Sequence, residues 1–258
     1  MKKIFVSGGQ GFIARNILEQ LKYDFVAPIH DELDLLDPQA VAKFFKDKQF
    51  DVVIHCASIG GRSFTEGEDV FYQNITMFEN IIKYENQFNK FINIGSGAEY
   101  DKQKPIRDVD EYFERVPQDY YGMAKQIISK VCEKKEFMVN LRCFGVWGKY
   151  EKENRLITSL IKDQVTTIHD CLFSYCYIDD LVKIIDWFIK NDSEFNIYNV
   201  GGVKIRLSDI AKKLNKKVNI IDDGLEYTCD DSQLRKELDF KFSDFDKCLK
   251  KYQNYIKQ

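Results

Sequence analysis

The sequence predicts an α/β fold in which helices cover both faces of a doubly wound parallel sheet. Over the first 145 residues, short apolar runs alternate with helical patterns, the order that strand–helix–strand units produce. A glycine-rich turn follows the first run, and serines stand at or just after the ends of three runs, at Ser7, Ser58 and Ser96. The carboxyl ends of parallel strands meet at one edge of the sheet, where such sheets bind their ligands.

Each element of this part follows from its own residues. Residues 3–7 form a buried apolar strand, and Pro28 confines the second strand because proline cannot donate to a sheet ladder. Pro38 favours the first turn of a helix. The expected strands are 3–7, 25–29, 51–57, 90–94 and 137–142. The expected helices are 12–22, one that begins at Pro38, 69–86 and 121–131.

After about Gly148 the alternation weakens, and a smaller lobe is expected to follow the main sheet. Its expected elements are helices at 155–162, 179–190, 207–214 and 245–256, with a strand-like run at 172–178. We therefore divide the chain into a main domain at 1–148 and a lobe at 149–258. The apolar segment 195–202 is expected to return to the sheet of the main domain.

The composition describes an ordinary globular protein and excludes several classes of function. The net charge of −3 gives no general attraction to nucleic acid or to an anionic membrane. The amino-terminal apolar run is far too short for an export or membrane segment. Seven scattered cysteines without a Cys-x-x-Cys pair suit reduced thiols in a cytoplasmic protein. His169, Cys171 and Cys176 lack the spacing of metal ligands, so no metal is expected.

The glycine-rich turn is the first chemical signal. Gly8, Gly11 and Ala14 keep the spacing Gly-x-x-Gly-x-x-Ala directly after the first strand. Gly8 permits the tight turn and Gly11 a close approach of a pyrophosphate, which also meets the free amides of the helix start at Phe12 and Ile13. The turn predicts a Rossmann-type dinucleotide-binding domain at 1–148, but it does not identify the reaction.

The sequence leaves the preferred nicotinamide nucleotide open. A carboxylate after the second strand favours NAD, whereas an arginine favours the 2′-phosphate of NADP. Here the second strand leads into residues 30–34, with neither an obvious arginine nor a cleanly placed carboxylate. Asp34 or Leu35 either contacts the adenine or belongs to a turn that caps a helix. The expected cofactor is therefore NADPH or NADH.

Tyr121 and Lys125 are the second chemical signal. At i and i+4 of a helix they share one face, where an ammonium stabilises an ionised phenol whose ordinary pKa is about 10. Ser96, at the end of the fourth expected strand, can hydrogen-bond the oxygen that receives the proton. A lone Tyr-x-x-x-Lys is common by chance. After a dinucleotide turn, it indicates a nicotinamide oxidoreductase with Ser96, Tyr121 and Lys125 as catalytic residues.

Together these motifs resemble the extended short-chain dehydrogenase/reductases that act on nucleotide sugars, the NAD-dependent epimerase/dehydratase family. Within it the chain is most similar to GDP-L-fucose synthase-like reductases, through residues 31–37 and Asn74 in the long helix. The resemblance implies contacts to the nicotinamide nucleotide from Cys56, Ala57, Ser58, Asn74, Tyr121 and Lys125. It implies contacts to the sugar nucleotide from Ser96, Gly97, Ala98, Phe144, Gly145 and Arg155.

Departures from the family pattern narrow the reaction. In the fucose synthases a cysteine two places after the serine works with a histidine to epimerise the sugar, and here those places hold Ala98 and Arg155. Alanine cannot exchange a proton, so epimerisation by that pair is not expected. Sugar dehydratases carry an Asp-Glu pair where this chain has Gly97 and Ala98, which disfavours dehydration. Arg155 either contacts a substrate phosphate or lies on a solvated helix face.

The sequence therefore predicts a cytoplasmic NAD(P)H-dependent reductase of the 4-keto group of a nucleotide-linked sugar, which the resemblance connects with surface polysaccharides. A 4-epimerase that retains NAD uses the same three residues and stays open as an alternative. A non-catalytic dinucleotide sensor is the alternative from another class, although a sensor has no need of a proton donor. The apolar helices at 70–88 and 121–131 favour a homodimer.

Overall fold

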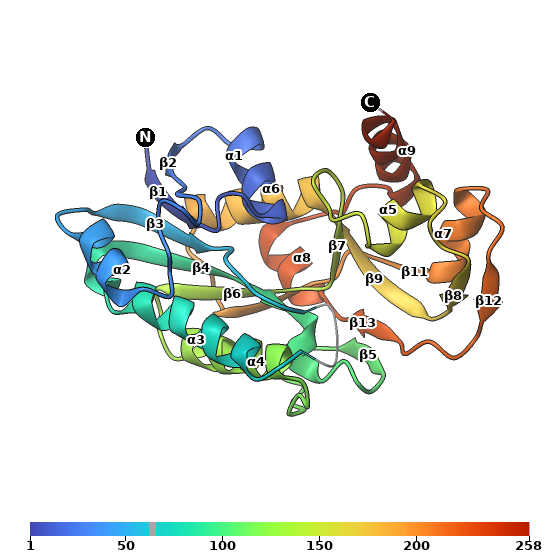
Figure 1. Ribbon diagram of the computed structural model, residues 1–258, viewed down its shortest axis with the longest axis horizontal. Helices are drawn as coiled ribbons and strands as arrows, with labels where there is room; N and C mark the ends of the chain where they lie inside the picture. Colours follow the sequence, from blue (N-terminus) through green and yellow to red (C-terminus); the bar gives the residue numbers. More distant parts are fainter. Residues whose placement is uncertain (62–65, 258) are drawn as a thin grey trace.

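The computed structural model describes residues 1–61 and 66–257, and most of these lie in or around two sheets (Figure 1). The main sheet has the strand order β10-β6-β4-β3-β1-β2, and every neighbouring pair is parallel. Its strands are β1 (Lys3–Ser7), β2 (Asp24–Val26), β3 (Phe50–His55), β4 (Phe88–Ser96), β6 (Met138–Cys143) and β10 (Ile197–Val200). The expected doubly wound α/β fold is confirmed.

Helices cover both faces of the main sheet. On one face α1 (Phe12–Gln20) and α6 (Ile178–Lys190) lie side by side, and their apolar residues share one core with β1, β3 and β4 (Figure 1). On the other face α2 (Pro38–Phe45), α3 (Asp69–Ile82) and α4 (Tyr120–Glu133) enclose a second core. Among the described residues, no helix combines the length and hydropathy that a bilayer crossing requires.

The direction in which strands are added reverses between β1 and β3. From β1 the chain adds β2 on one side, whereas β3 and the later strands extend the sheet on the other. Open α/β sheets bind ligands outside the carboxyl ends of the strands at such a reversal. The topology thus directs attention to the residues that follow β1 and β3.

The second sheet brings distant segments together. It has the order β11-β9-β13-β5, and β7 also pairs with β9. Its strands are β5 (Ile106–Val109), β7 (Gly145–Trp147), β9 (Leu172–Tyr177), β11 (Val203–Arg206) and β13 (Tyr227–Cys229). Around it lie α5 (Leu156–Ile161), β8 (Thr167–His169), α7 (Leu207–Lys213), β12 (Asn219–Ile221), α8 (Ser232–Leu238) and α9 (Phe245–Ile256). Because β5 and β7 precede residue 148, this sheet draws strands from both sides of the expected boundary.

Several predicted ends differ from the structure for local reasons. The first helix ends at Gln20 rather than at residue 22, since Leu21 is already extended with φ −102° and ψ 158°. The third strand ends at His55, two residues early, because the next two backbone amides turn to the hydroxyl of Ser7. The helix expected over 69–86 ends at Ile82 and is followed by a separate 3₁₀ turn, η1 (Glu85–Gln87).

Candidate active site

A cavity of about 260 Å³ opens at the reversal point of the main sheet. We call it the dinucleotide cavity. Its walls come from the glycine turn after β1, the segment after β2 and the residues after β3. Seven of the residues that the sequence predicts for the cofactor line it: Gly8, Gly11, Asp34, Leu35, Cys56, Ala57 and Ser58.

The glycine turn forms a cradle whose backbone packs too closely on its neighbours to admit larger residues. Gly8 has a φ of +69°, a left-handed conformation, and a Cβ there would lie 3.0 Å from the backbone of Ala57. A Cβ on Gly9 would lie 2.5 Å from the carbonyl oxygen of Ala27, which follows β2. The turn is closed by the Gly11 amide, which donates to the carbonyl of Gly8 at 2.7 Å. Gly8, Gly9 and Gly11 line the cavity without side chains, so a dinucleotide can approach the backbone of the turn.

The start of α1 supplies further donors. Its N-cap is Gly11, and no side chain caps it, so the first amides of the helix are left for a ligand or solvent. Phe12 and Ile13 begin this turn, but their side chains pack against the core instead of lining the cavity. Their expected part in binding a pyrophosphate therefore falls to backbone N–H groups.

Asn74 holds in place the loop after β3, which lines the cavity. This buried side chain accepts from the Ile59 amide at 3.1 Å and donates back to the Ile59 carbonyl at 2.8 Å. It also accepts from the hydroxyl of Ser58 at 3.2 Å and donates to the carbonyl of Val70. Both donors of the amide are thereby used. Asn74 holds the loop after β3 in place, and Ser58 presents that loop to the cavity.

Ser7 and His55 hold the ends of β1 and β3 together. The Ser7 hydroxyl lies 2.9 Å from Nδ1 of His55 and accepts from the amides of Cys56 and Ala57, each at 3.1 Å. Burial lowers the pKa of His55 to about 3, and the nearby charge of Lys125 acts in the same direction. His55 is therefore neutral near pH 7 and serves as a structural residue.

The Tyr-x-x-x-Lys pair lies in the first turns of α4. Lys125 is 2% exposed, and its Nζ donates to the carbonyl of Ile94 on β4 at 3.0 Å. The same Nζ lies 5.7 Å from the centre of the Tyr121 ring. Tyr121 itself is half-buried, with the backbone of Gly61 against its ring, whereas Tyr120 is 40% exposed. A second cation, Lys102, lies 5.4 Å from the centre of the same ring.

Ser96 ends β4 and caps a short 3₁₀ helix, η2 (Gly97–Tyr100). Its hydroxyl accepts from the Ala98 amide at 3.2 Å, while its own amide donates to the carboxylate of Glu99 at 3.0 Å. This reciprocal capping box fixes the backbone of Ser96. A Cβ on Gly122 would lie only 2.7 Å from the Ala98 carbonyl, so η2 packs directly on the first turn of α4. This packing brings the Ser96 segment to the turn that carries Tyr121.

A buried ion pair behind Ser96 was not predicted from the sequence. Glu99 accepts from Nε of Arg142 at 2.7 Å, with 1% and 7% of the two side chains exposed. Arg142 also donates to the hydroxyl of Tyr100 at 2.6 Å and to that of Ser129 at 3.1 Å. A charged residue inside an apolar strand, such as Arg142 in β6, is the sequence signal that could have indicated such a pair.

Three aromatic side chains, Phe144, Phe173 and Tyr227, form what we call the aromatic wall beside Ser96. The Tyr227 ring centre lies 4.7 Å from that of Phe144 and 4.8 Å from that of Phe173. A Cβ on Gly97 would lie 2.4 Å from the Tyr227 hydroxyl, and one on Gly145 would lie 2.7 Å from the Phe173 ring. Both glycines therefore make room for the wall.

The sequence does not predict a role for Tyr227 in the site. Burial raises its pKa well above the usual range, while an interaction with the Ser96 side chain acts in the opposite direction. It lies 131 positions after Ser96 in the chain and reaches it only because β13 pairs with β5 and β9. No local sequence motif predicts that Tyr227 lies close to Ser96.

The other expected substrate residues differ in their surroundings. Ala98 and Phe144 are 2% and 1% exposed, so they pack inside the protein beside Ser96. Arg155 is half-exposed at the N-cap of α5, where it donates to Glu151 at 3.2 Å and to the Val146 carbonyl at 3.1 Å. Within residues 1–61 and 66–257, no group of three or more His, Cys, Asp and Glu side chains is arranged to hold a metal ion.

A family model for the NAD dependent epimerase/dehydratase family matches residues 4–201. The chain belongs to this family. Its members are NAD(P)-dependent, so the expected resemblance and the expected class of cofactor are confirmed. The family includes oxidoreductases and epimerases that act on nucleotide sugars.

Relatives in the family have several activities. GDP-L-colitose synthase from Yersinia pseudotuberculosis is 25% identical over 236 residues, which cover 77% of this chain and 76% of that enzyme. GDP-L-fucose synthase from Escherichia coli K12 is 30% identical over 145 residues, 51% of this chain and 45% of that enzyme.

Two solved structures share the fold over nearly all of both chains. A GDP-mannoheptose C4 reductase from Campylobacter jejuni with NADP bound gives a TM-score of 0.84 at 20% identity, covering 100% of this chain and 98% of the other. A UDP-glucuronic acid 4-epimerase from Bacillus cereus with NAD gives 0.83 at 21% identity, covering 99% of each. At such identities these likenesses show the fold alone.

Proposed function

We propose that the protein reduces the 4-keto group of a nucleotide-linked sugar or deoxysugar with NADPH or NADH, in the cytoplasmic biosynthesis of surface polysaccharide. The observation that supports this most is Lys125, which is held against the end of β4 and close to the Tyr121 ring, beside the segment that carries Ser96. This arrangement suits proton transfer to a carbonyl oxygen. The GDP-L-colitose and GDP-L-fucose synthases and the GDP-mannoheptose C4 reductase, which this chain resembles, support a nucleotide-linked sugar as the substrate.

The chain's residues divide the work in this proposal. Gly8, Gly11 and the amides at the start of α1 hold the pyrophosphate of the dinucleotide, and Lys125 holds the ribose beside the nicotinamide. When bound, the reduced nicotinamide supplies a hydride to the keto carbon and becomes NAD(P)⁺. Tyr121 gives its phenolic proton to the carbonyl oxygen and recovers a proton from solvent. Ser96 hydrogen-bonds the same oxygen and orients it.

The surroundings of Ala98 argue for reduction without epimerisation by the cysteine–histidine route. Ala98 carries no exchangeable proton. Glu99, the residue after Ala98, carries a carboxylate that already accepts hydrogen bonds from the Ser96 amide and from Arg142. It therefore does not replace the cysteine as a proton-exchanging group. A 4-epimerase that retains its NAD needs only the three residues already named.

The test is a screen of nucleotide-linked 4-keto sugars with NADPH and with NADH, followed by the loss of reduced-nicotinamide absorbance. We expect stoichiometric oxidation of the cofactor with at least one keto sugar, and loss of that turnover in Ser96→Ala. NAD that copurifies with the protein and interconverts 4-epimers without net oxidation would favour the epimerase. Dinucleotide binding without turnover of any keto sugar or epimer would contradict both and favour a sensor.

The division of the chain is part of the proposal. Residues 1–148 would bind the dinucleotide, and 149–258 would mainly bind the sugar nucleotide, with Arg155 near a substrate phosphate. Two of the three residues of the aromatic wall, Phe173 and Tyr227, come from the later segment, and the third, Phe144, comes from the earlier one. Competition of the free nucleoside diphosphate with substrate, compared between Arg155→Gln and the unmodified protein, measures that contact.

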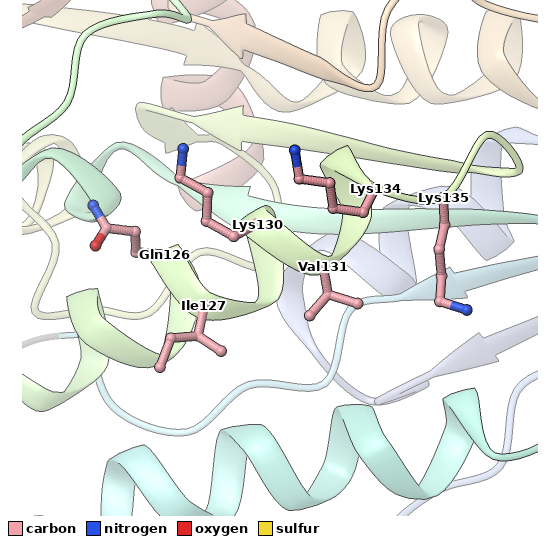
Figure 2. A pocket seen from close by; sticks show the side chains of 6 residues that line it. All are labelled: Gln126, Ile127, Lys130, Val131, Lys134 and Lys135. Carbon is pink, nitrogen blue, oxygen red and sulfur yellow. The ribbon is translucent and has the colours of Figure 1, made fainter.

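We also propose that two copies pair through α3 and α4. These helices lie against each other, and a surface hollow of about 360 Å³ lies along α4 (Figure 2). In Figure 2, Ile127 and Val131 point to the side on which α3 lies, while Lys130 and Lys134 point away from it. Tyr72 on α3 and Ile127 on α4 are 59% and 46% exposed despite their apolar surfaces. Analytical ultracentrifugation should give a dimer that Ile127→Asp dissociates, and a monomeric unmodified protein would contradict the pairing.

A further inference from the structure

We infer that the dinucleotide cavity selects NADH over NADPH. This inference rests on the proposed function, because it concerns the cofactor of the same site. It is carried by the adenosine end of the cavity, where the two nucleotides differ by one phosphate group on the ribose 2′-oxygen. The question is which side chains of this chain would face that phosphate.

The geometry of the glycine turn locates this end of the cavity. Because the position of a Cβ on Gly9 is 2.5 Å from the Ala27 carbonyl, the turn lies directly against the backbone that follows β2. In doubly wound sheets the residue at the end of the second strand faces the ribose hydroxyls. Gln10 from the turn, with Pro28 and His30 from the segment after β2, line the cavity on this side.

The chemistry of this lining does not suit a 2′-phosphate. Proteins bind that group with arginine, whose planar donors and permanent charge match phosphate oxygens. Among the described residues that line the cavity there is no arginine or lysine. The only carboxylate among them, Asp34, is held in place by the Leu36 amide at 2.9 Å, and like charge would repel a phosphate.

The arginine that stands closest to the glycine turn in the sequence is engaged elsewhere. Arg15 on α1 stacks on the ring of Tyr150, with its guanidinium carbon 3.5 Å from the ring centre. The Tyr150 ring also lies near Tyr255 of α9, at 6.1 Å between centres. Arg15 does not line the cavity. A free 2′-hydroxyl needs only hydrogen-bonding groups, which Gln10 and His30 supply.

Direct binding measurements test this without any sugar substrate. Titration of the full-length protein by calorimetry with NADH, NADPH, ADP-ribose and 2′-phospho-ADP-ribose gives four dissociation constants. We expect each ligand without the 2′-phosphate to bind about tenfold or more tightly than its phosphorylated partner, because the lining offers that phosphate no cationic hydrogen-bond donor. NADPH binding as tightly as NADH would overturn this inference and leave the reductase proposal standing. Binding of none of the four would overturn both.

A pair of matched substitutions locates the selection. His30→Arg places a guanidinium at the expected 2′-position and should raise the affinity for NADPH about tenfold, since it supplies the missing charged hydrogen bond. His169→Arg makes the same change at an exposed histidine of β8, paired there with Asp223 at 2.6 Å, and should leave the NADH to NADPH ratio unchanged. Equal responses in the two variants, or none at His30, would overturn the assignment of the 2′-position.

Discussion

The dinucleotide cavity and the aromatic wall are built in different ways from the same chain. The cavity comes from short segments that follow neighbouring strands, and its turn residues lie within a few positions of one another. The wall combines Phe144, Phe173 and Tyr227, which are far apart in sequence and meet through the second sheet. A local motif can therefore indicate the cofactor, whereas the aromatic wall, which we propose to contact the sugar, forms only when the fold is complete.

Loss of the buried ion pair between Glu99 and Arg142, which lies behind Ser96, is expected to have the largest effect, a fall in the free energy of unfolding. Glu99→Gln leaves Arg142 as a buried charge without its partner, and we expect the free energy of unfolding to fall by about 3–5 kcal/mol. Urea denaturation followed by circular dichroism measures the change. Glu114→Gln, which breaks an exposed pair with Lys130, is the matched control and should leave the unfolding midpoint unchanged. Equal midpoints in the two variants would mean that long-range polar contacts do not hold the Ser96 segment.

A substitution in the glycine turn tests how far the dinucleotide cavity depends on local sequence. Gly9→Ala forces a Cβ against the Ala27 carbonyl and should weaken dinucleotide binding about tenfold, because the strained turn moves away from β2. Gly67→Ala is the control, since a Cβ there meets no atom of the described residues within 4 Å. Calorimetric titration with NADH compares the two. An unchanged affinity in Gly9→Ala would show that the cradle tolerates a side chain and that dinucleotide binding does not depend on a glycine at this position.

A substitution in the aromatic wall is expected to have the smallest effect, a change in the KM for the sugar. It also distinguishes sugar binding from dinucleotide binding most clearly. Tyr227→Phe keeps the ring but removes the hydroxyl near Gly97 and Ser96. We expect the KM for the keto sugar to rise between about twofold and tenfold, the value of one hydrogen bond, with the dissociation constant of the dinucleotide unchanged. A change in dinucleotide affinity, with the sugar KM unaffected, would reverse the assignment of the two regions.

Elements with strong periodicity could be predicted from the sequence almost to the residue. The first strand at Lys3–Ser7 and the last helix at Phe245–Ile256 agree with their expected bounds. Their patterns depend on neighbours one to four positions away, which the sequence displays directly. The glycine turn belongs to the same class, and the cavity above it contains most of the residues expected to contact the cofactor.

The second sheet could not be predicted in the same way. β13 has three residues and β5 has four, too few for a reliable period, and they pair across about 120 positions of sequence. Glu99 also escaped prediction, because a glutamate beside a strand end is ordinarily solvated unless a partner such as Arg142 meets it in the fold. The place of Tyr227 could not be predicted either, because β13 is short and because its partner Ser96 is distant in the sequence. The assignment of catalytic roles to Ser96, Tyr121 and Lys125 stays a prediction.

One measurement tests the central claim, that the Tyr121 phenol delivers the proton to the reduced sugar. Steady-state turnover of the best keto sugar is compared between Tyr121→Phe and Tyr120→Phe. Each variant removes one phenolic hydroxyl, and the two residues are adjacent in α4. We expect kcat to fall by about 10²–10⁴ in Tyr121→Phe and to stay within about twofold in Tyr120→Phe. Undiminished turnover in Tyr121→Phe, or a loss confined to Tyr120→Phe, would contradict the account.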